Sequence, residues 1–271
     1  MKIAFIGGGN MGEAMLAAVL KTSPAPHGIS VSDISDTRRI HIEKQYWDRH
    51  STTALTTTSD NRQAVAGADI VVLAVKPQTL AEVMAGLSGQ LKSGQVALSI
   101  VAGAGIETLS KGLKHGAIAR AMPNTPARIG EGMSVWTATP EVTEEQKGLV
   151  GAILGAMGAE IYVDDEKYID MATAISGSGP AYFFLMAESL IEAAEAIGLP
   201  RDMARQLVVQ TMLGSGRLIQ QSGEEPAELR RKVTSPGGTT ARALEQFEKG
   251  QFTGLVKRAV QAAYDRAREL G

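Results

Sequence analysis

Two glycine-rich stretches hold the residue types that could bind a small anionic molecule and react with it. The first, GGGNMG, contains the spacing Gly7-x-Gly9-x-x-Gly12, directly after an apolar run and before a helical pattern. In that setting the first glycine permits a tight turn, the second lets the backbone approach a pyrophosphate, and the third lets the helix pack close to the strand. The N–H groups at the helix start then attract phosphate. This stretch predicts a dinucleotide-binding site.

The second stretch, SPGGTT, runs from Ser235 to Thr240 and precedes another helical pattern. It contains no acid, no base and no metal ligand. Its hydroxyls and its backbone N–H groups at a helix start suit an anion such as a carboxylate. The alternative is that Thr239 or Thr240 only caps the helix. These residues alone leave both interpretations open.

The end of the second expected strand carries conflicting signals about the cofactor. Asp33 lies there, about 20 residues past the glycine motif, where an acid usually accepts a hydrogen bond from a ribose 2′-hydroxyl and favours NAD. Ser35, Thr37, Arg38 and Arg39 follow and could hold the 2′-phosphate of NADP. The alternative for the two arginines is a solvated first helical turn. Both cofactors therefore stay open from these residues.

Three more motifs stand near predicted strand ends or helix starts: AVKP at 74–77, RAMPNTPA at 120–127 and SGSGPAY at 176–182. Ligands bind outside the carboxyl ends of the strands in an open α/β sheet. Lys76 and Asn124 offer polar contacts there, and the SGSG segment precedes a helix with Pro180 near its start. The alternatives are an ordinary loop, a structural turn and a helix cap.

The elements that must position these residues change in type along the chain. Up to residue 163, short apolar runs alternate with helical patterns, which predicts βαβ units and a parallel sheet. The expected strands are 2–7, 29–33, 68–75, 95–103, 117–122, 132–139 and 159–163, the last two at the sheet edge. The expected helices among them are 10–21, 37–47, 78–87 and 105–113.

Beyond residue 163 only helical patterns are found, at 180–199, 201–221, 225–233, 239–250 and 252–270. The predicted fold class is therefore α/β, with an N-terminal Rossmann dinucleotide-binding domain over 1–163 and a C-terminal all-helical dimerisation domain over 164–271. The helix expected over 180–199 is apolar around most of its circumference and must be buried on several sides. A domain of about 100 residues has a limited interior. This favours a partner subunit, and the alternative is a central helix within one chain's own bundle.

Composition excludes several classes of protein. The 271 residues carry a net charge of −2 and show no basic stripe, so no nucleic-acid partner is expected. The chain has no cysteine, which excludes disulfides and thiolate chemistry, and no metal site is expected. No apolar run approaches the roughly 20 residues that span a bilayer. Because the first strand is expected from residue 2, no signal peptide is expected and the cytoplasm is the expected location.

In order, the motifs FIGGGNMG, AVKP, SIVAG, RAMPNTPA, SGSGPAY and SPGGTT resemble those of the pyrroline-5-carboxylate reductases. The glycine motif is shared with many dehydrogenases, whereas MPNTP, SGSGPAY and SPGGTT in succession are specific. The resemblance covers residues 3 to 240. It implies an oxidoreductase that uses NAD(P)H to reduce the imine of 1-pyrroline-5-carboxylate to L-proline, the last step of proline biosynthesis. It also implies a homodimer, often gathered into larger rings.

The resemblance also implies roles for individual residues. Thr240 is the expected catalytic residue, bonded to the ring nitrogen or the carboxylate of the substrate. The expected substrate-binding residues are Ser235, Gly237, Gly238, Thr239, Thr240, Ser176 and Ser178. The expected cofactor-binding residues are Gly7, Gly9, Asn10, Met11, Gly12, Asp33, Ser35, Ala74, Val75, Lys76, Pro77, Ala102, Met122 and Asn124. The family favours NADPH with Ser35 at its 2′-phosphate, but Asp33 departs from the neutral residue of many NADPH-preferring relatives, so NADH stays open.

The expected reaction needs little acid–base machinery. The ring nitrogen of an imine can arrive already protonated, so no base has to remove a hydroxyl proton. Positioning and electrostatics are then the main tasks. The four histidines lie outside the matched motifs: His27, His41, His50 and His115. Two rival functions are a β-hydroxyacid dehydrogenase, with Lys167 or Lys232 as its catalytic lysine, and a non-catalytic dinucleotide sensor, which would need no carboxylate pocket.

Overall fold

The computed structural model describes residues 1–22, 24–47 and 53–270. The chain forms two compact units, of which the first comprises residues 1–178 and the last turns of the chain from Ala263. The second unit comprises Gly179–Ala262. The predicted domain boundary after residue 163 stays a prediction, and the two compact units divide between Ser178 and Gly179.

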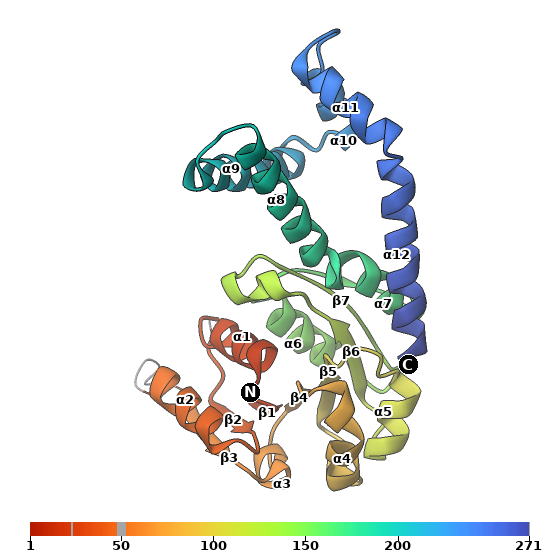
Figure 1. The fold of residues 1–271 in the computed structure, drawn as a ribbon. Coiled ribbons are helices and arrows are strands. Elements are labelled where there is room, and N and C mark those ends of the chain that lie inside the picture. Colours follow the sequence, from red (N-terminus) through yellow and green to blue (C-terminus); the bar gives the residue numbers. More distant parts are fainter. Residues whose placement is uncertain (23, 48–52, 271) are drawn as a thin grey trace. The chain divides into compact units, whose positions relative to one another are not determined.

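The first unit is built on an eight-stranded sheet with the order β3-β2-β1-β4-β5-β6-β7-β8 (Figure 1). Its strands are β1 (Lys2–Ile6), β2 (Gly28–Ser32), β3 (Ala54–Thr58), β4 (Ile70–Leu73), β5 (Val96–Ser99), β6 (Ile118–Met122), β7 (Gly132–Ala138) and β8 (Gly158–Tyr162). Neighbouring strands are parallel except for the antiparallel pair β6–β7. The order 3-2-1-4-5-6 is that of the Rossmann fold, which confirms the prediction for this part of the chain.

Helices cover both faces of this sheet (Figure 1). One face carries α1 (Asn10–Val19), α2 (Asp36–Tyr46) and α6 (Glu144–Gly155), and the other carries α3 (Asn61–Val65), α4 (Pro77–Leu87) and α5 (Ile106–Leu113). Successive side chains of a strand point to opposite faces. Accordingly, Phe5 packs in the cluster with Met15 of α1, and Ile6 packs in the cluster with Leu80 of α4. These clusters fix the helix starts above the carboxyl ends of the strands.

Several elements were not expected from the sequence. They are β3, α3, α6 and α7 (Lys167–Ala172). The strand β3 has the sequence ALTTT, in which only Leu55 is buried, so no apolar run marks it. After α7 the chain forms a π-helical turn over Thr173–Gly177.

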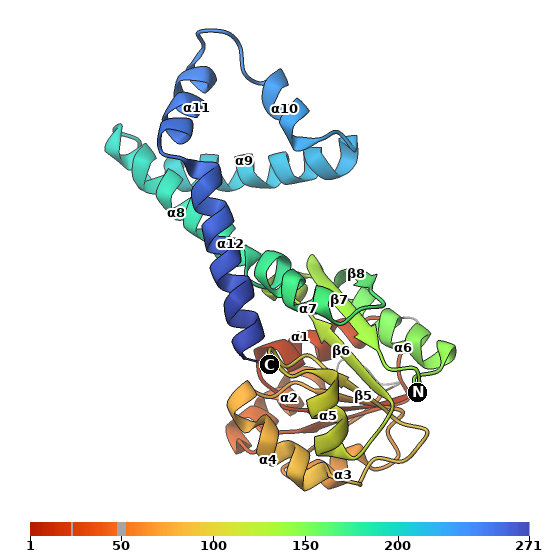
Figure 2. The same ribbon diagram turned by 90° about the vertical axis from the view of Figure 1, so that its right-hand side faces the viewer.

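The second unit is helical throughout. It contains α8 (Gly179–Ala196), α9 (Arg201–Ser222), α10 (Pro226–Lys232), α11 (Thr239–Lys249) and most of α12 (Phe252–Glu269). The helices α8 and α9 pack against each other (Figure 2). Of the hydrophobic residues described in this unit, only Ala204 is buried, whereas Phe183, Phe184 and Leu185 are each more than 60% exposed. The unit thus lacks a core of its own, which favours the predicted partner subunit. In the described residues no helix is long and apolar enough to cross a membrane.

Candidate active site

The glycine loop after β1 is shaped for close approach by a ligand. Gly7 has a φ of +102°, and a Cβ there would lie 2.7 Å from the carbonyl oxygen of Ala74. A Cβ on Gly12 would overlap the carbonyl oxygen of Gly7, so α1 can pack this closely only with glycine. At Gly9, the N-cap residue of α1, a Cβ would meet no atom within 4 Å. The fold therefore requires Gly7 and Gly12, while Gly9 leaves open space at a helix start that fits a pyrophosphate.

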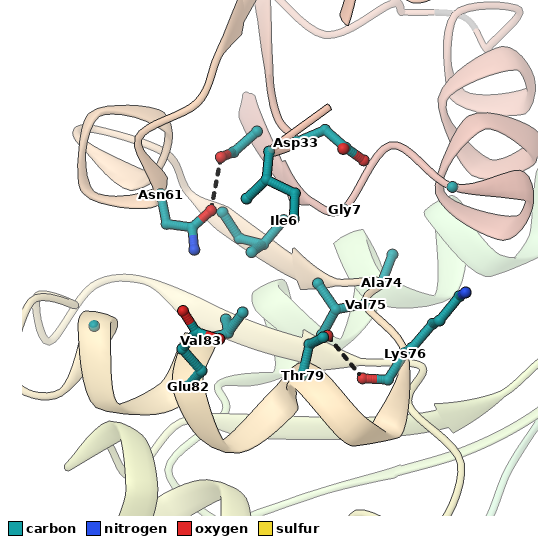
Figure 3. A pocket seen from close by; sticks show the side chains of 14 residues that line it. Ile6, Gly7, Asp33, Asn61, Ala74, Val75, Lys76, Thr79, Glu82 and Val83 are labelled. Atoms are coloured by element: carbon teal, nitrogen blue, oxygen red, sulfur yellow. Dashed lines mark hydrogen bonds between the residues drawn. The ribbon is translucent and has the colours of Figure 1, made fainter. Parts of the chain in front are cut away.

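A cavity of about 770 Å³ lies at the carboxyl ends of β1, β2 and β4 (Figure 3). Its size is that of an ordinary small-molecule site. Figure 3 shows Asp33 and Asn61 on one wall and Lys76, Thr79 and Glu82 on the other. Of the predicted cofactor residues, six line this cavity: Gly7, Gly9, Asp33, Ala74, Val75 and Lys76.

The other predicted cofactor residues are not part of the lining of this cavity. Asn10, Met11 and Gly12 form the first turn of α1, Pro77 begins α4, and Ala102 follows β5. Ser35 is the N-cap residue of α2, where its hydroxyl accepts a hydrogen bond from Arg38 N at 3.3 Å. Contact of each of these residues with the cofactor stays a prediction.

Sequence reasoning missed polar residues of the lining, above all Asn61. Its side-chain oxygen accepts a hydrogen bond from Ser32 Oγ at 2.6 Å (Figure 3). Asn61 opens α3 directly after β3, at the edge where the other strands also end. Recognition of β3 would have indicated it, because ligand-binding residues of such sheets follow strand ends.

Asp33 is held by two backbone N–H groups. Its Oδ2 accepts from Gly8 N at 2.9 Å, and its Oδ1 accepts from Ser35 N at 2.9 Å. The carboxylate therefore links the glycine loop to the turn between β2 and α2. It also lines the cavity, so its remaining lone pairs are available to a ribose hydroxyl.

The two arginines of α2 are bonded to the protein itself and only partly exposed, and a contact of either with a 2′-phosphate stays a prediction. Arg38 donates through Nε to the carbonyl oxygen of Gly8 and forms an ion pair through Nη2 with Glu13 of α1. Arg39 donates through Nη1 to the carbonyl oxygen of Asp33 at 2.5 Å. The side chains of Arg38 and Arg39 are 24% and 18% exposed.

Glu13 accepts hydrogen bonds from three side chains. Besides Arg38, they are His41 through Nε2 at 2.8 Å and Tyr46 through its hydroxyl at 3.2 Å. Burial alone would raise the pKa of Glu13, but hydrogen bonds from His41 and Arg38 outweigh it and lower that pKa. Glu13 is therefore a carboxylate at neutral pH and holds Arg38 in place.

A second group of predicted residues meets at the end of β6. Asn124 donates through Nδ2 to the carbonyl oxygen of Ser176 at 3.0 Å and accepts from Met133 N at 2.9 Å. Ser176 Oγ donates to the carbonyl oxygen of Ala172 at 3.0 Å. Asn124 therefore braces the SGSG segment. Its hydrogen bond with Ser176 shows that the fold brings these two predicted residues together. A contact of either with cofactor or substrate stays a prediction.

The π-helical turn is locked against the same strand end. Ser178 N donates to the carbonyl oxygen of Thr173 at 2.8 Å, which closes the turn. A Cβ on Gly177 would lie 3.0 Å from Met122 Cε, so Met122 packs close to the turn. Such π-helical turns occur often at functional sites.

An ion-pair network around one buried guanidinium supports this region. Arg120 of β6 pairs through Nη1 with Glu166 at 2.7 Å and through Nη2 with Asp170 of α7 at 2.7 Å. Its side chain is 6% exposed. Glu166 also accepts from Ile106 N, the first residue of α5, at 2.8 Å. One guanidinium thereby joins β6, α5 and α7.

The SPGGTT stretch lies in the second unit, at the start of α11. Gly238 is the N-cap residue of that helix, so Thr239 and Thr240 are its first two residues. The alternative that one of these threonines caps the helix is therefore wrong. Gly237 has a φ of +71°, and Gly238 N donates to Ser235 O at 3.0 Å. The loop presents N–H groups at a helix start, and the predicted substrate contacts of Ser235, Gly237, Gly238, Thr239 and Thr240 stay predictions.

The residues of the rival dehydrogenase lie elsewhere. Lys167 pairs with Asp165 at 2.7 Å, and Lys232 pairs with Glu224 at 2.5 Å; both lysines are more than half exposed. Neither lines the cavity, nor do the described histidines. His50 lies outside the described residues. Within residues 1–22, 24–47 and 53–270, no three or more histidine, aspartate or glutamate side chains are grouped so that they could hold a metal ion.

Two family models match the chain. Residues 166–270 match the model described as pyrroline-5-carboxylate reductase dimerisation. Residues 2–103 match the model described as NADP oxidoreductase, coenzyme F420-dependent. The two matches confirm the predicted order of a nucleotide-binding α/β part and a helical dimerisation part.

Relatives match over nearly the full length. The pyrroline-5-carboxylate reductase of Pseudomonas aeruginosa is 40% identical over 99% of this chain and 96% of its own. That of Synechocystis is 41% identical over 100% of this chain and 98% of its own. A solved structure of the reductase from Coxiella burnetii has a TM-score of 0.89 and 37% identity over 99% of this chain and 98% of its own. The solved structure of the Plasmodium falciparum pyrroline carboxylate reductase with NADP bound has a TM-score of 0.87 and 32% identity over 100% of this chain and 98% of its own. The chain therefore belongs to the pyrroline-5-carboxylate reductase family.

Proposed function

We propose that this protein reduces 1-pyrroline-5-carboxylate to L-proline with NAD(P)H. The observation that carries the proposal is the glycine-lined cavity at the carboxyl edge of the sheet, in a chain that matches reductases of this name over nearly its full length. Bound NADPH supplies a hydride. The imine carbon of the substrate accepts it, the electron pair of the C=N bond moves to the protonated ring nitrogen, and proline results.

The cofactor is held by the first unit. The turn at Gly7 and the open side of Gly9 receive the pyrophosphate at the N-terminus of α1, whose dipole and N–H groups favour the anion. Lys76 lines the same cavity and contributes a positive charge. Asp33 and Asn61 line the opposite wall of the cavity and would form hydrogen bonds with the adenosine ribose.

The SPGGTT loop of the second unit is the proposed binding site of the substrate. Its carboxylate binds the Ser235 hydroxyl and the N–H groups at the start of α11, and Thr240 forms a hydrogen bond with the ring nitrogen or the carboxylate. Ser176 and Ser178 line the nicotinamide side. The reaction needs no metal and no base, since the ring nitrogen arrives protonated.

NADPH is the preferred cofactor in this proposal. Ser35 lies at the start of α2, directly after the acidic strand end, and provides a hydroxyl for a 2′-phosphate. We place the protein in the cytoplasm as a homodimer that can assemble into a larger ring. The exposed apolar side chains of α8 and α9 support the dimer.

One assay tests the proposed function. NADPH and NADH oxidation is followed at 340 nm, with and without 1-pyrroline-5-carboxylate, in parallel with NADP⁺ reduction by 3-hydroxy acids. We expect oxidation only with the imine, and a higher kcat/KM with NADPH than with NADH. Turnover of 3-hydroxy acids would favour the rival dehydrogenase. Binding of NADPH without any turnover would favour the sensor.

A further inference from the structure

The peptide groups of Gly8 are held from both sides. This residue stands between Gly7 and Gly9, which line the cavity. Its N–H donates to Asp33 Oδ2 at 2.9 Å, and its carbonyl oxygen accepts from Arg38 Nε. A Cβ on Gly8 would lie 2.6 Å from Ile42 Cδ1 of α2, so the loop rests directly on that helix. The hydrogen bonds of Gly8 thus go to the turn after β2 and to α2, not to the cavity.

These two side chains are themselves fixed. Asp33 also accepts from Ser35 N at 2.9 Å, which sets the plane of its carboxylate. Arg38 is fixed by its ion pair with Glu13. Glu13 stands on α1, the helix whose start faces the cavity, and His41 and Tyr46 anchor its carboxylate as well. The arrangement is therefore a closed chain of contacts from the glycine loop through α2 to α1 and back to the loop.

We propose that Asp33 and Arg38 are positioning residues that lock the Gly8 peptides and so preset the pyrophosphate-binding loop, with Glu13 acting through Arg38. In the ordinary Rossmann site, the acid after the second strand reads the ribose 2′-hydroxyl. In this structure that acid accepts a hydrogen bond from the loop itself. Preset backbone geometry improves binding because less conformational freedom is lost when the ligand binds. The proposal rests on the proposed function only in requiring that a dinucleotide binds here.

A nucleotide without the 2′-hydroxyl separates the two roles of Asp33. We suggest titrating ADP and 2′-deoxy-ADP into the wild type and Asp33→Ala by calorimetry, with Asp164→Ala, an exposed acid, as the matched control. If Asp33 positions the loop, the variant weakens binding of 2′-deoxy-ADP by about 5-fold or more, the effect of at least one lost hydrogen bond. A loss confined to ADP would mean that Asp33 only reads the ribose, and would overturn the proposal for this residue.

A double-mutant cycle tests the part played by Glu13. Arg38→Met and Glu13→Gln should each weaken the binding of 2′-deoxy-ADP. Because Glu13 acts through Arg38, adding Glu13→Gln to Arg38→Met should cause no further loss of affinity. Losses that multiply would refute that link. If Asp33→Ala does not fold, the affinity of Arg38→Met for 2′-deoxy-ADP tests the proposal. An affinity equal to that of the wild type would overturn the positioning role.

The failure of this proposal is distinguishable from failure of the proposed function. A wild type that binds both nucleotides with affinities that the variants leave unchanged would overturn the positioning role alone. A wild type that binds neither nucleotide would overturn the dinucleotide site on which both proposals rest.

Discussion

Replacing Thr240 with valine separates a role in catalysis from a role in folding. Valine keeps the β-branched shape and removes only the hydroxyl. Thr240 is the second residue of α11, and Gly238 is the N-cap residue, so the hydroxyl is not required as the cap. Threonine and valine also have similar helix propensities. We therefore expect the melting temperature of Thr240→Val to stay close to that of the wild type.

The expected loss in catalysis is large by comparison. A hydrogen bond to a charged group contributes roughly 1.5–3 kcal/mol. If Thr240 forms that bond as the hydride arrives, the loss falls on the transition state, and kcat/KM falls roughly 10- to 150-fold. The affinity for NADPH should hardly change, because the glycine loop that receives it belongs to the first unit.

The assay measures kcat/KM, the Kd of NADPH and the melting temperature on the same preparation. Thr108→Val, an exposed position on α5, is the matched control and should behave as the wild type. A Thr240→Val enzyme with normal kcat/KM would refute the catalytic role. A lower melting temperature with normal kinetics would show that the hydroxyl supports only the fold.

Four further outcomes are expected. Gly9→Ala should keep its melting temperature and weaken NADPH binding, whereas Gly12→Ala should be destabilised because its Cβ overlaps backbone; equal melting temperatures would contradict this. Arg120→Met leaves two partly buried carboxylates without their cation, so we expect a loss of about 3 kcal/mol in the free energy of unfolding, measured with urea; an unchanged midpoint would sink the argument. Light scattering should give at least twice the chain mass of 28.5 kDa, and Phe184→Glu on α8 should lower it; a monomeric wild type would exclude the dimer. Because the fold lowers the pKa of Glu13, the hydrogen bonds of this carboxylate stabilise the protein at pH values above the ordinary carboxyl pKa and are lost as the pH falls through the lowered pKa. The melting temperatures of the wild type and Glu13→Gln should therefore converge on acidification. A difference that stays constant with pH would contradict the assignment.

Much of the fold was predictable because its signals are local. The glycine spacing predicted the turn at Gly7 and the close packing at Gly12, and apolar runs marked the buried strands. The edge strand β3 was missed because its threonines leave no apolar run, and Asn61 at its end was missed with it. The edge strand β8 was predicted from its apolar residues, whereas the threonine-rich edge strand β3 was missed.

The hydrogen bonds of the candidate site were less predictable because they join distant positions. Gly8 is separated from Asp33 and Arg38 by 25 and 30 residues, and no local pattern pairs them. The same holds for Asn124 and Ser176, which are 52 residues apart. Residue types predicted which side chains are suited to cofactor binding. Only the structure shows which of these side chains form hydrogen bonds with the backbone.

The most direct test follows a labelled hydride into the product. The enzyme is incubated with 1-pyrroline-5-carboxylate and NADPH that carries deuterium at both C4 positions of the nicotinamide, and the proline formed is examined by mass spectrometry and NMR. The proposed reaction predicts one deuterium per proline, on the δ-carbon that was the imine carbon of the substrate. Proline without deuterium, deuterium at another carbon, or no proline at all would contradict direct hydride transfer to the imine.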